Sequence, residues 1–357
     1  MSILITGGTG FVGKRLIQKL IDRTTNVIPT PIILCTRKID RSNSLMQSSD
    51  GVLSSNRPNN DQSFSILPFQ WSPTDGPIDL TDRLLQNSGE LSGAIQADRE
   101  DANWRRNVVV ALKQSPISTV INLMGESVAE GRWTKEKKRR IRESRVQGTR
   151  NLVDGLIQSN QIPQVFVSAS AIGFYGDRAD QTITEATKAG DDFLAEVGDA
   201  WESEADRMSE HGARVIKLRL GLVMGTDGGA LQKMLPIFRW GGGGRLGSGQ
   251  QWMSWIHIDD LISMIVWTMT QPDLAGPFNA VAPAPIRNVD FTKQLAAAVN
   301  RPAILPVPAF ALKVTLGEFS QELLSSKRVV PQAALASGFK FEFETFDKAI
   351  ADLLAAK

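Results

Sequence analysis

The sequence is poor in the residues that build disulfide frameworks and metal centres. Its 357 residues include one cysteine and two histidines. The single cysteine, Cys35, cannot form an internal disulfide. His211 and His257 stand far apart in the chain and leave no cluster with zinc-ligand spacing. We therefore expect neither a disulfide-stabilised scaffold nor a bound metal.

The chain also lacks long apolar runs and a strong excess of either charge. No apolar stretch approaches the roughly 20 residues that cross a bilayer, so we expect no membrane span. The 40 lysines and arginines nearly balance 38 aspartates and glutamates, which gives no reason to expect nucleic acid as a partner. The expectation is a soluble protein of the cytoplasm or of an organelle interior, such as a plastid or mitochondrion. A homodimer is compatible with the sequence.

Apolar, β-branched runs alternate with segments of helical periodicity. The runs lie at 2–6, 32–35, 64–69, 119–123, 164–167 and 214–220. Such alternation predicts a parallel sheet with helices on both faces. We therefore predict an α/β fold, with a Rossmann-type, doubly wound domain over 1–225 that carries a polar insertion at about 41–61. A smaller C-terminal substrate lobe is predicted over 226–357.

A glycine-rich turn, GGTGFVG at 7–13, separates the first predicted strand from the first predicted helix. Gly7 would allow the tight turn, and Gly10 would let the backbone approach a pyrophosphate. Gly13 would permit close packing of the helix on the strand. Because the phosphates would rest on the helix N-terminus, this context predicts a dinucleotide cofactor. The alternative is a turn of structural importance only.

The same residues partly match a second phosphate-binding pattern. Gly8-x-x-x-x-Gly13-Lys14 resembles the loop of nucleoside triphosphatases. Arg15 stands where that loop needs a Ser or Thr to hold magnesium. The nucleotide-hydrolase interpretation therefore ranks below the dinucleotide one.

The end of the second predicted strand indicates which dinucleotide is bound. NAD sites place a carboxylate there to accept hydrogen bonds from the ribose 2′-hydroxyl. This chain has Arg37 and Lys38 instead, and no carboxylate before Asp40. Two cations would pair with a 2′-phosphate, which favours NADP(H) over NAD. The alternative is that both cations are solvated at the start of a loop.

Further motifs follow the glycine turn in order along the chain. They are NLMGE at 122–126, RWTKEKK at 132–138, SRVQGT at 144–149, VSASAIGFYG at 167–176, FLAEVGDAWE at 193–202, RLGLVMGTDGGAL at 219–231 and GRLGSGQQWMSWIHIDDL at 244–261. With these motifs the sequence resembles the extended short-chain dehydrogenase/reductases. It is most similar to the atypical subfamily called epimerase family proteins or SulA-like cell-division proteins, to which the plant Giant Chloroplast protein is related. The segment at about 305–354 resembles the short C-terminal domain of that subfamily.

The resemblance implies a Rossmann domain that binds NADP(H) and a C-terminal lobe that closes over a substrate cleft. The residues that it places around the cofactor are Gly7, Thr9, Gly10, Phe11, Val12, Gly13, Arg37, Lys38, Asn122, Leu123, Met124 and Gly125. The subfamily is not tied to a defined substrate. The expected substrate is therefore an unknown small molecule.

The usual catalytic pair of this superfamily is missing. Its enzymes use Tyr-x-x-x-Lys, in which the lysine lowers the pKa of the tyrosine and the phenol transfers a proton. The only tyrosine, Tyr175, is followed four residues later by Ala179. The helix on which the pair is expected carries Trp201 and Ala205 at the corresponding spacing. Ordinary epimerase or dehydrogenase activity is therefore in doubt.

Four polar side chains remain as catalytic candidates: Ser168, Ser170, Tyr175 and Glu202. Ser170 is the better candidate for a hydrogen bond to a substrate oxygen, with Ser168 next. Tyr175 could donate a proton from another direction, and Glu202 could act if burial raises its pKa. The alternative is that the serines only satisfy backbone groups. Trp133 and Trp252 either line the substrate cleft or pack in the core.

Two functions remain open. The first is an NADP(H)-dependent oxidoreductase or epimerase-like enzyme with an altered proton donor. The second is a catalytically weak nucleotide-sensing or scaffold protein in cell or organelle division, whose shape NADP binding would stabilise.

Overall fold

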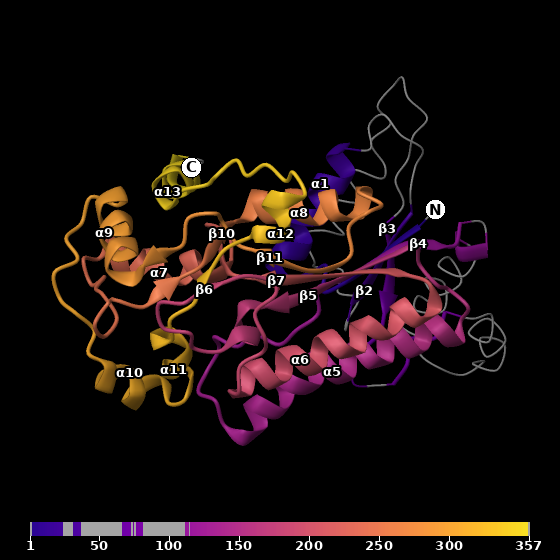
Figure 1. Cartoon of the computed structure of the whole chain (residues 1–357), viewed down its shortest axis with the longest axis horizontal. Helices are drawn as coiled ribbons and strands as arrows, with labels where there is room; N and C mark the ends of the chain where they lie inside the picture. The colour runs from indigo at the N-terminus through magenta and orange to yellow at the C-terminus, as the bar shows by residue number, and fades with distance from the viewer. Residues whose placement is uncertain are drawn as a thin grey trace, which may run out of the picture. The chain divides into compact units, whose positions relative to one another are not determined.

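The computed structural model describes residues 2–23, 31–36, 66–72, 74, 76–80, 111–113 and 115–355 (Figure 1). The strands are β1 (Ser2–Thr6), β2 (Ile32–Thr36), β3 (Ile66–Gln70), β4 (Ile117–Asn122), β5 (Val165–Ala171), β6 (Thr182–Ile183), β7 (Arg214–Leu220), β8 (Leu222–Met224), β9 (Trp252–Met253), β10 (Trp255–His257), β11 (Gly276–Ala280), β12 (Ile286–Arg287) and β13 (Arg328–Val329). The α-helices are α1 (Phe11–Arg23), α5 (Lys135–Gln158), α6 (Phe193–Asp206), α7 (Gly229–Arg239), α8 (Ile258–Thr270), α9 (Asn288–Ala298), α10 (Ala309–Leu316), α11 (Phe319–Leu324), α12 (Gln332–Ala336) and α13 (Phe346–Ala355). The described residues also contain two 3-10 helices, η3 (Ile172–Tyr175) and η4 (Arg207–His211).

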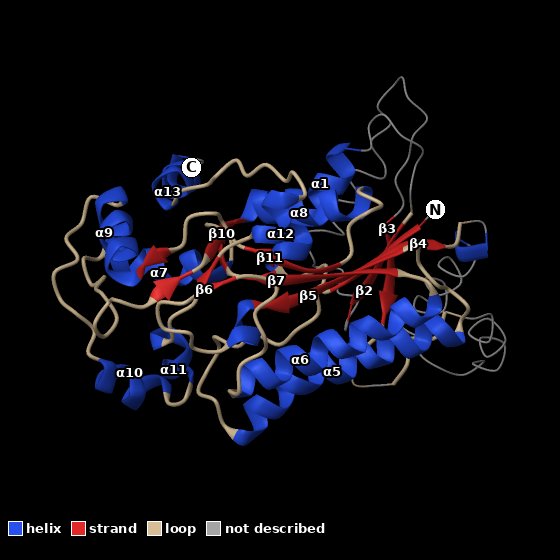
Figure 2. Cartoon of the chain, in the orientation of Figure 1, coloured by secondary structure: helices blue, strands red, loops and turns tan. Residues whose placement is uncertain are grey.

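A seven-stranded sheet has the strand order β11-β7-β5-β4-β1-β2-β3 (Figure 2). The pairs β1–β2, β1–β4, β2–β3, β4–β5 and β7–β11 are all parallel. Parallel strands need crossover connections, and the helices that follow β1 and β4 supply them. From β1 the chain adds β2 and β3 on one side of the sheet, and it then crosses to the other side of β1 to add β4 and β5. This change of direction is typical of a doubly wound sheet. The predicted α/β, Rossmann-type fold is confirmed.

Most strand predictions agree with the structure in position, and one run was predicted too short. The runs at 2–6 and 214–220 coincide with β1 and β7. The run at 164–167 ended early, because β5 continues to Ala171 and contains both Ser168 and Ser170. The prediction ended the strand where polar residues begin, but both serines are buried within the sheet. The polar insertion at about 41–61 lies outside the described residues.

The chain divides into two compact units. The first contains Met1–Gly125, Glu143–Ser168 and Ser203–Val215, and the second contains Glu126–Arg142, Ala169–Glu202 and Ile216–Lys357. The division passes through β5, β7, α5 and α6. The domain boundary near residue 225 stays a prediction.

The core of the first unit lies between its parallel strands and the helix that crosses over from β4. Leu4, Val120 and Phe166 from three strands are fully buried, as is Leu152 of α5. Helix α1 and the later half of α5 lie on opposite sides of these strands (Figure 1). Burial on both faces explains why β1 and β4 read as continuous apolar runs.

The core of the second unit is rich in aromatic rings. Phe346 of α13 contacts Trp255 at a ring-centroid distance of 5.3 Å and Phe291 of α9 at 4.4 Å. The rings of Trp267 and Phe278 lie 6.0 Å apart in an edge-on arrangement. The two contacts of Phe346 attach the C-terminal helix to the rest of this unit, because aromatic pairs add to the free energy of apolar burial.

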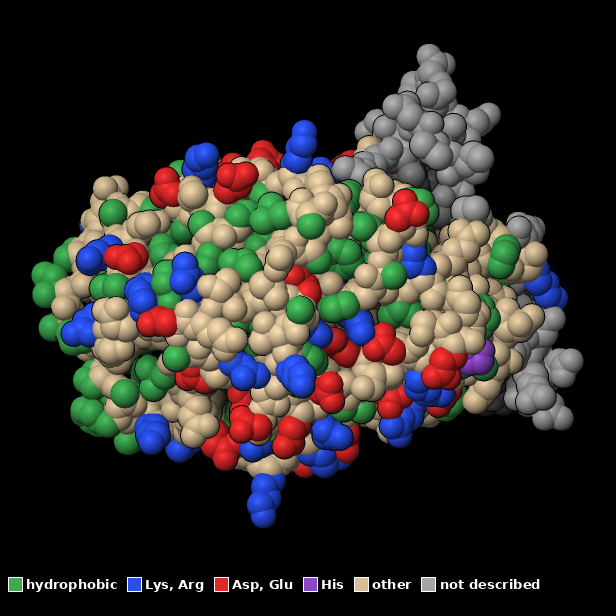
Figure 3. All heavy atoms as spheres, viewed as in Figure 1, with side chains coloured by type: hydrophobic (Ala, Val, Ile, Leu, Met, Phe, Trp, Pro, Cys, Tyr) green, Lys and Arg blue, Asp and Glu red, His purple; other side chains and the backbone are tan. Residues whose placement is uncertain are grey.

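The surface carries both signs of charge. On the face shown in Figure 3, lysines and arginines are interspersed with aspartates and glutamates. Among the helices that the structure describes, none has the length and apolar character needed to cross a membrane.

Candidate functional site

The turn after β1 has room only for glycine at its first position. Gly7 adopts φ +69°, in the left-handed region that other residues rarely occupy. A Cβ atom on Gly7 would lie 2.6 Å from the carbonyl oxygen of Leu123. The end of β4 therefore passes directly over the turn, and the structure brings together 7–13 and 122–125, the two segments that the resemblance places around the cofactor.

The other glycines let α1 begin immediately above the turn. A Cβ on Gly13 would lie 2.4 Å from Gly8 Cα, and a Cβ on Gly8 would lie 2.2 Å from the Leu34 side chain. Gly10 is exposed, and its N–H donates to Gly7 O at 3.0 Å. The helix N-terminus is thus bordered by backbone without side chains, which suits a pyrophosphate. The sequence analysis did not assign a role to Gly8, although its place in the GG pair was a signal.

A neutral hydrogen-bond network lies beneath this turn. The Asn122 side chain accepts from Thr6 Oγ1 at 2.8 Å and donates to Thr149 Oγ1 at 2.9 Å and to Ser168 Oγ at 3.3 Å. Its oxygen also lies 3.5 Å from the N–H of Met124. Asn122 is fully buried. Its amide therefore positions the end of β4, and Thr6 and Thr149 are partners that sequence reasoning missed.

The remaining predicted cofactor residues differ in exposure. Thr9, Phe11, Val12 and Leu123 are half-buried. Met124 is buried and Gly125 is exposed. Arg37 and Lys38, on which the preference for a 2′-phosphate rests, lie outside the described residues.

The second unit contains a charged network centred on Glu202. Its carboxylate accepts a hydrogen bond from Ser170 Oγ at 2.7 Å. Arg219 binds both carboxylate oxygens at 2.8 Å, in a bidentate pair. Lys217 Nζ lies 4.0 Å from the same carboxylate. Because Glu202 is 6% exposed and Arg219 is 5% exposed, the two side chains form a buried, bidentate ion pair.

Arg219 connects this carboxylate to the only tyrosine. One terminal nitrogen donates to Tyr175 Oη at 2.8 Å, and Tyr175 in turn donates to Asn279 Oδ1 at 2.7 Å. The guanidinium also lies 3.7 Å from the ring centroid of Phe174. Burial raises the pKa of Tyr175 to about 12, against the opposing effect of Arg219. The phenol is therefore protonated at neutral pH, and both of its hydrogen-bonding functions are occupied.

The structure brings three of the four catalytic candidates into one network: Ser170, Tyr175 and Glu202. Ser168, two residues earlier on β5, belongs instead to the network of Asn122. Sequence reasoning missed Arg219, which stands in the RLGL motif, and Asn279. Trp201 and Ala205 are both buried on α6.

The two tryptophans that the sequence analysis left open have different surroundings. Trp133 contacts the rings of Phe193 and Phe319 at centroid distances of 5.5 and 5.6 Å. Trp252 lies between two arginines, Arg287 and Arg328.

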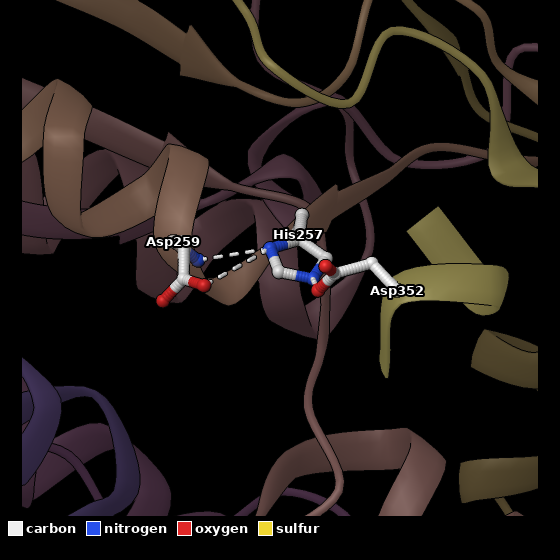
Figure 4. A group of neighbouring side chains, drawn as sticks. All are labelled: His257, Asp259 and Asp352. Atoms are coloured by element: carbon white, nitrogen blue, oxygen red, sulfur yellow. Dashed lines mark hydrogen bonds and ion pairs between the residues drawn. The ribbon is translucent and has the colours of Figure 1, made fainter. Parts of the chain in front are cut away.

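His257 directly precedes α8 and lies near two carboxylates, that of Asp259 in α8 and that of Asp352 in α13 (Figure 4). Its Nδ1 accepts the N–H of Asp259 at 3.1 Å, as a helix N-cap. Nε2 is buried without a hydrogen-bond partner, 3.4 Å from Asp352 Oδ2. The ring nitrogens thus face different carboxylates, so a shared cation would find only Nε2 available. The expectation of no metal stays a prediction.

Comparison with known proteins assigns the chain to a family. A model of the NAD dependent epimerase/dehydratase family matches residues 3–281. This chain belongs to that family. A second family model, a domain of unknown function, matches residues 307–353, within the segment predicted to form a C-terminal subfamily domain.

Curated relatives support this assignment along nearly the whole chain. An epimerase family protein SDR39U1 homologue, described as chloroplastic, from Arabidopsis thaliana is 35% identical over 347 residues, or 96% of this chain and 84% of the relative. An epimerase family protein of Staphylococcus haemolyticus is 34% identical and covers 99% of both chains. Neither name mentions cell division, and the predicted SulA-like subfamily link is not supported.

Solved structures agree with the fold. The crystal structure of human epimerase family protein SDR39U1 with NADPH has a TM-score of 0.76 and 25% identity, and it covers 100% of both chains. A UDP-glucose 4-epimerase from Thermotoga maritima has a TM-score of 0.67 and covers 99% of both chains. Its 15% identity supports the fold alone.

Proposed function

We propose that this family member binds NADP(H) and uses it in oxidoreductase or epimerase-like chemistry on a small-molecule substrate. The observation that carries the proposal is the glycine turn, where Gly7, Gly8 and Gly13 leave no space for a Cβ atom directly before α1. The NADPH bound to the human relative supports the 2′-phosphorylated form. Arg37 and Lys38 are the proposed ligands of that phosphate.

The proposed proton path uses Ser170 and Glu202 in place of Tyr-x-x-x-Lys. Bound nicotinamide would accept or supply the hydride. Ser170 Oγ would accept the proton of a substrate hydroxyl while passing its own proton to Glu202, whose carboxylate already accepts that hydrogen bond at 2.7 Å. Arg219 would hold the carboxylate in position by its two hydrogen bonds.

Tyr175 is a poorer proton donor in this arrangement. Its pKa, raised to about 12, makes it a weak acid, and its oxygen already bonds Arg219 and Asn279. A catalytic acid works best when its pKa lies near the working pH. We therefore assign Tyr175 to the support of Arg219.

Calorimetric titration with NADPH, NADP, NADH and NAD tests the cofactor assignment. We expect tighter binding of the two 2′-phosphorylated forms. Gly10→Asp should abolish this binding, because a carboxylate would stand at the exposed start of α1 where the phosphates are placed. Gly242→Asp is the matched control, since a Cβ there meets only ordinary contacts at 3.5 and 3.6 Å. The assignment would be contradicted if none of the four nucleotides gave a heat of binding, or if NAD bound more tightly than NADP.

Single-turnover oxidation of bound NADPH by a panel of carbonyl compounds and sugar nucleotides tests the proton path. Ser170→Ala and Glu202→Gln should each slow turnover about 10²- to 10⁴-fold, with NADPH binding unchanged. Ser168→Ala is the control, because Ser168 lies in the other network. Equal losses in Ser168→Ala and Ser170→Ala would count against the assigned path.

The missing Tyr-x-x-x-Lys pair favours a second candidate, a catalytically weak nucleotide-sensing protein. It predicts tight NADPH binding without turnover on any member of the panel. It also predicts that NADPH raises the melting temperature, as any ligand specific for the folded state does.

A further inference from the structure

Trp252, the first residue of β9, is flanked on two sides by arginines. Strand β12 pairs with β9 in antiparallel register, with Arg287 directly opposite Trp252. The main-chain N–H and C=O of Trp252 face the other way, toward Ser326 Oγ and Lys327 N, both at 3.1 Å. The chain at 326–328 therefore runs along the opposite edge of β9, and it brings Arg328 to the indole from that side.

Both guanidinium groups contact the indole ring. The Cζ atoms of Arg287 and Arg328 lie 4.5 and 4.8 Å from the ring centroid of Trp252. Cation–π contact and packing restrict the rotamers of both arginines. The tryptophan thus pre-organises two cations from separate segments of the chain.

The two arginines differ in their partners. Arg287 binds Asp180 Oδ1 at 3.0 Å, and the same oxygen accepts from Trp252 Nε1 at 2.9 Å. Arg328 has no carboxylate and no hydrogen-bond acceptor among the described residues, and its Nε is buried without a partner. Arg328 is half-buried, so a guanidinium that is held against the indole without an ion pair can offer its terminal nitrogens to a ligand.

A third cation lies beside this pair. Arg178 donates through Nε and a terminal nitrogen to the carbonyls of Tyr175, Lys188 and Ala189, at 2.9 to 3.0 Å. Its own N–H donates to Ser326 O at 3.0 Å, which fixes the 178–180 segment against the segment that carries Arg328. Of these three arginines, Arg287 alone bonds a carboxylate among the described residues, that of Asp180.

We propose that Arg328, with Arg287 beside it, binds the oxyanion of a small-molecule ligand, either a phosphate or a carboxylate group. The two terminal nitrogens of Arg328 form the fork that would receive the oxyanion, since Nε faces inward. Arg178 bonds directly to the carbonyl of Tyr175, beside the network of Ser170 and Glu202. We take the ligand to be the substrate of the proposed reaction, and this last step rests on the proposed function.

Titration with inorganic phosphate, pyrophosphate and malonate, followed by calorimetry, tests the site. The wild-type chain should bind at least one of these ions, and the phosphate and malonate arms distinguish the two oxyanions. Arg328→Gln should weaken binding roughly 10- to 100-fold, because a charge-assisted bidentate contact is lost. Arg328→Lys should give an intermediate affinity, because it keeps the charge but not the fork.

Two controls separate this site from other sources of affinity. Arg245→Gln removes an exposed arginine whose side chain donates to the carbonyls of Gly247 and Ser248, and it should leave ion binding unchanged. Gly10→Asp closes the dinucleotide site, so binding that survives in this variant does not come from the glycine turn. The proposal fails if no ion binds, if Arg245→Gln weakens binding as much as Arg328→Gln, or if Gly10→Asp abolishes it.

The two proposals can fail separately. Arg328→Gln should keep its NADPH affinity and melting temperature, so a loss of ion binding there is not a loss of folding. If NADPH does not bind while phosphate or malonate does, the function proposal falls and the oxyanion site stands. If Arg328→Gln does not fold, Arg328→Lys still tests the proposal. An ion affinity equal to that of the wild-type chain in this variant would contradict a bidentate contact.

Discussion

Two buried polar networks, one in each compact unit, differ in a single respect that decides what they can do. The network of Thr6, Asn122, Thr149 and Ser168 is neutral, and its members exchange hydrogen bonds that need no charge. The network of Ser170, Glu202 and Arg219 contains a desolvated ion pair. A neutral network can fix the backbone, whereas an ionised carboxylate can also receive a proton. The proposed proton path accordingly uses the network of the second unit, whereas the network of the first unit fixes the backbone.

The largest expected effect comes from breaking the ion pair. Arg219→Met should lower the free energy of unfolding by about 3–5 kcal/mol, because the buried Glu202 carboxylate loses its bidentate partner and keeps Lys217, 4.0 Å away, as its counter-charge. Urea denaturation measures this change. Arg207→Met is the control, since Arg207 is 37% exposed and its loss should cost about 1 kcal/mol or less.

The double variant Arg219→Met with Glu202→Leu sharpens the test. Replacing a buried pair by apolar side chains is often neutral, so most of the lost stability should return. If the double variant is as unstable as Arg219→Met alone, the loss comes from packing and not from charge.

Breaking the neutral network should cost less. Asn122→Ala should lower the free energy of unfolding by about 2–3 kcal/mol, because the hydrogen bonds of Asn122 to the buried hydroxyls of Thr6 and Thr149 are lost. Thr149→Val removes one hydrogen bond and should cost about 1 kcal/mol. A larger loss in Asn122→Ala than in Arg219→Met would reverse the comparison.

Tyr175 offers a spectroscopic measurement, because it is the only tyrosine in the chain. Its absorbance at the tyrosinate band should stay unchanged until the pH approaches about 12, since burial raises its pKa. Tyr175→Phe should cost about 1 kcal/mol of unfolding free energy and serves as the blank for the titration. Ionisation near pH 10 in the folded protein would show that the phenol is accessible.

The smallest effect should come from His257, which is buried as deeply as the networks but has no hydrogen-bonded counter-charge. Desolvation lowers its pKa from 6.5, so the unfolded chain takes up the proton first as the pH falls. Stability should therefore decrease as the pH drops from about 6.5 through the lower folded pKa. His257→Gln should reduce this slope. The exposed His211→Gln is the control, and an equal change in both variants would contradict the prediction.

The local pattern of the sequence was enough to predict the parallel sheet and the glycine turn, and the lack of a Tyr-x-x-x-Lys pair stays a prediction. Each of these depends on neighbours in the chain: apolar runs, glycines at fixed spacing, or one residue four positions from another. Ser170 and Glu202 were predicted as separate candidates for the same reason. The cations Arg37 and Lys38 stay a prediction from their place after a strand.

Only the tertiary structure decided which polar groups meet. Glu202 and Arg219 are 17 residues apart, and Tyr175 and Asn279 are 104 apart. Trp252 receives its arginines from segments on both sides of β9. Hydrogen bonds and ion pairs depend on distance in space and on burial, and the order of residues in the chain specifies neither until the strands have paired.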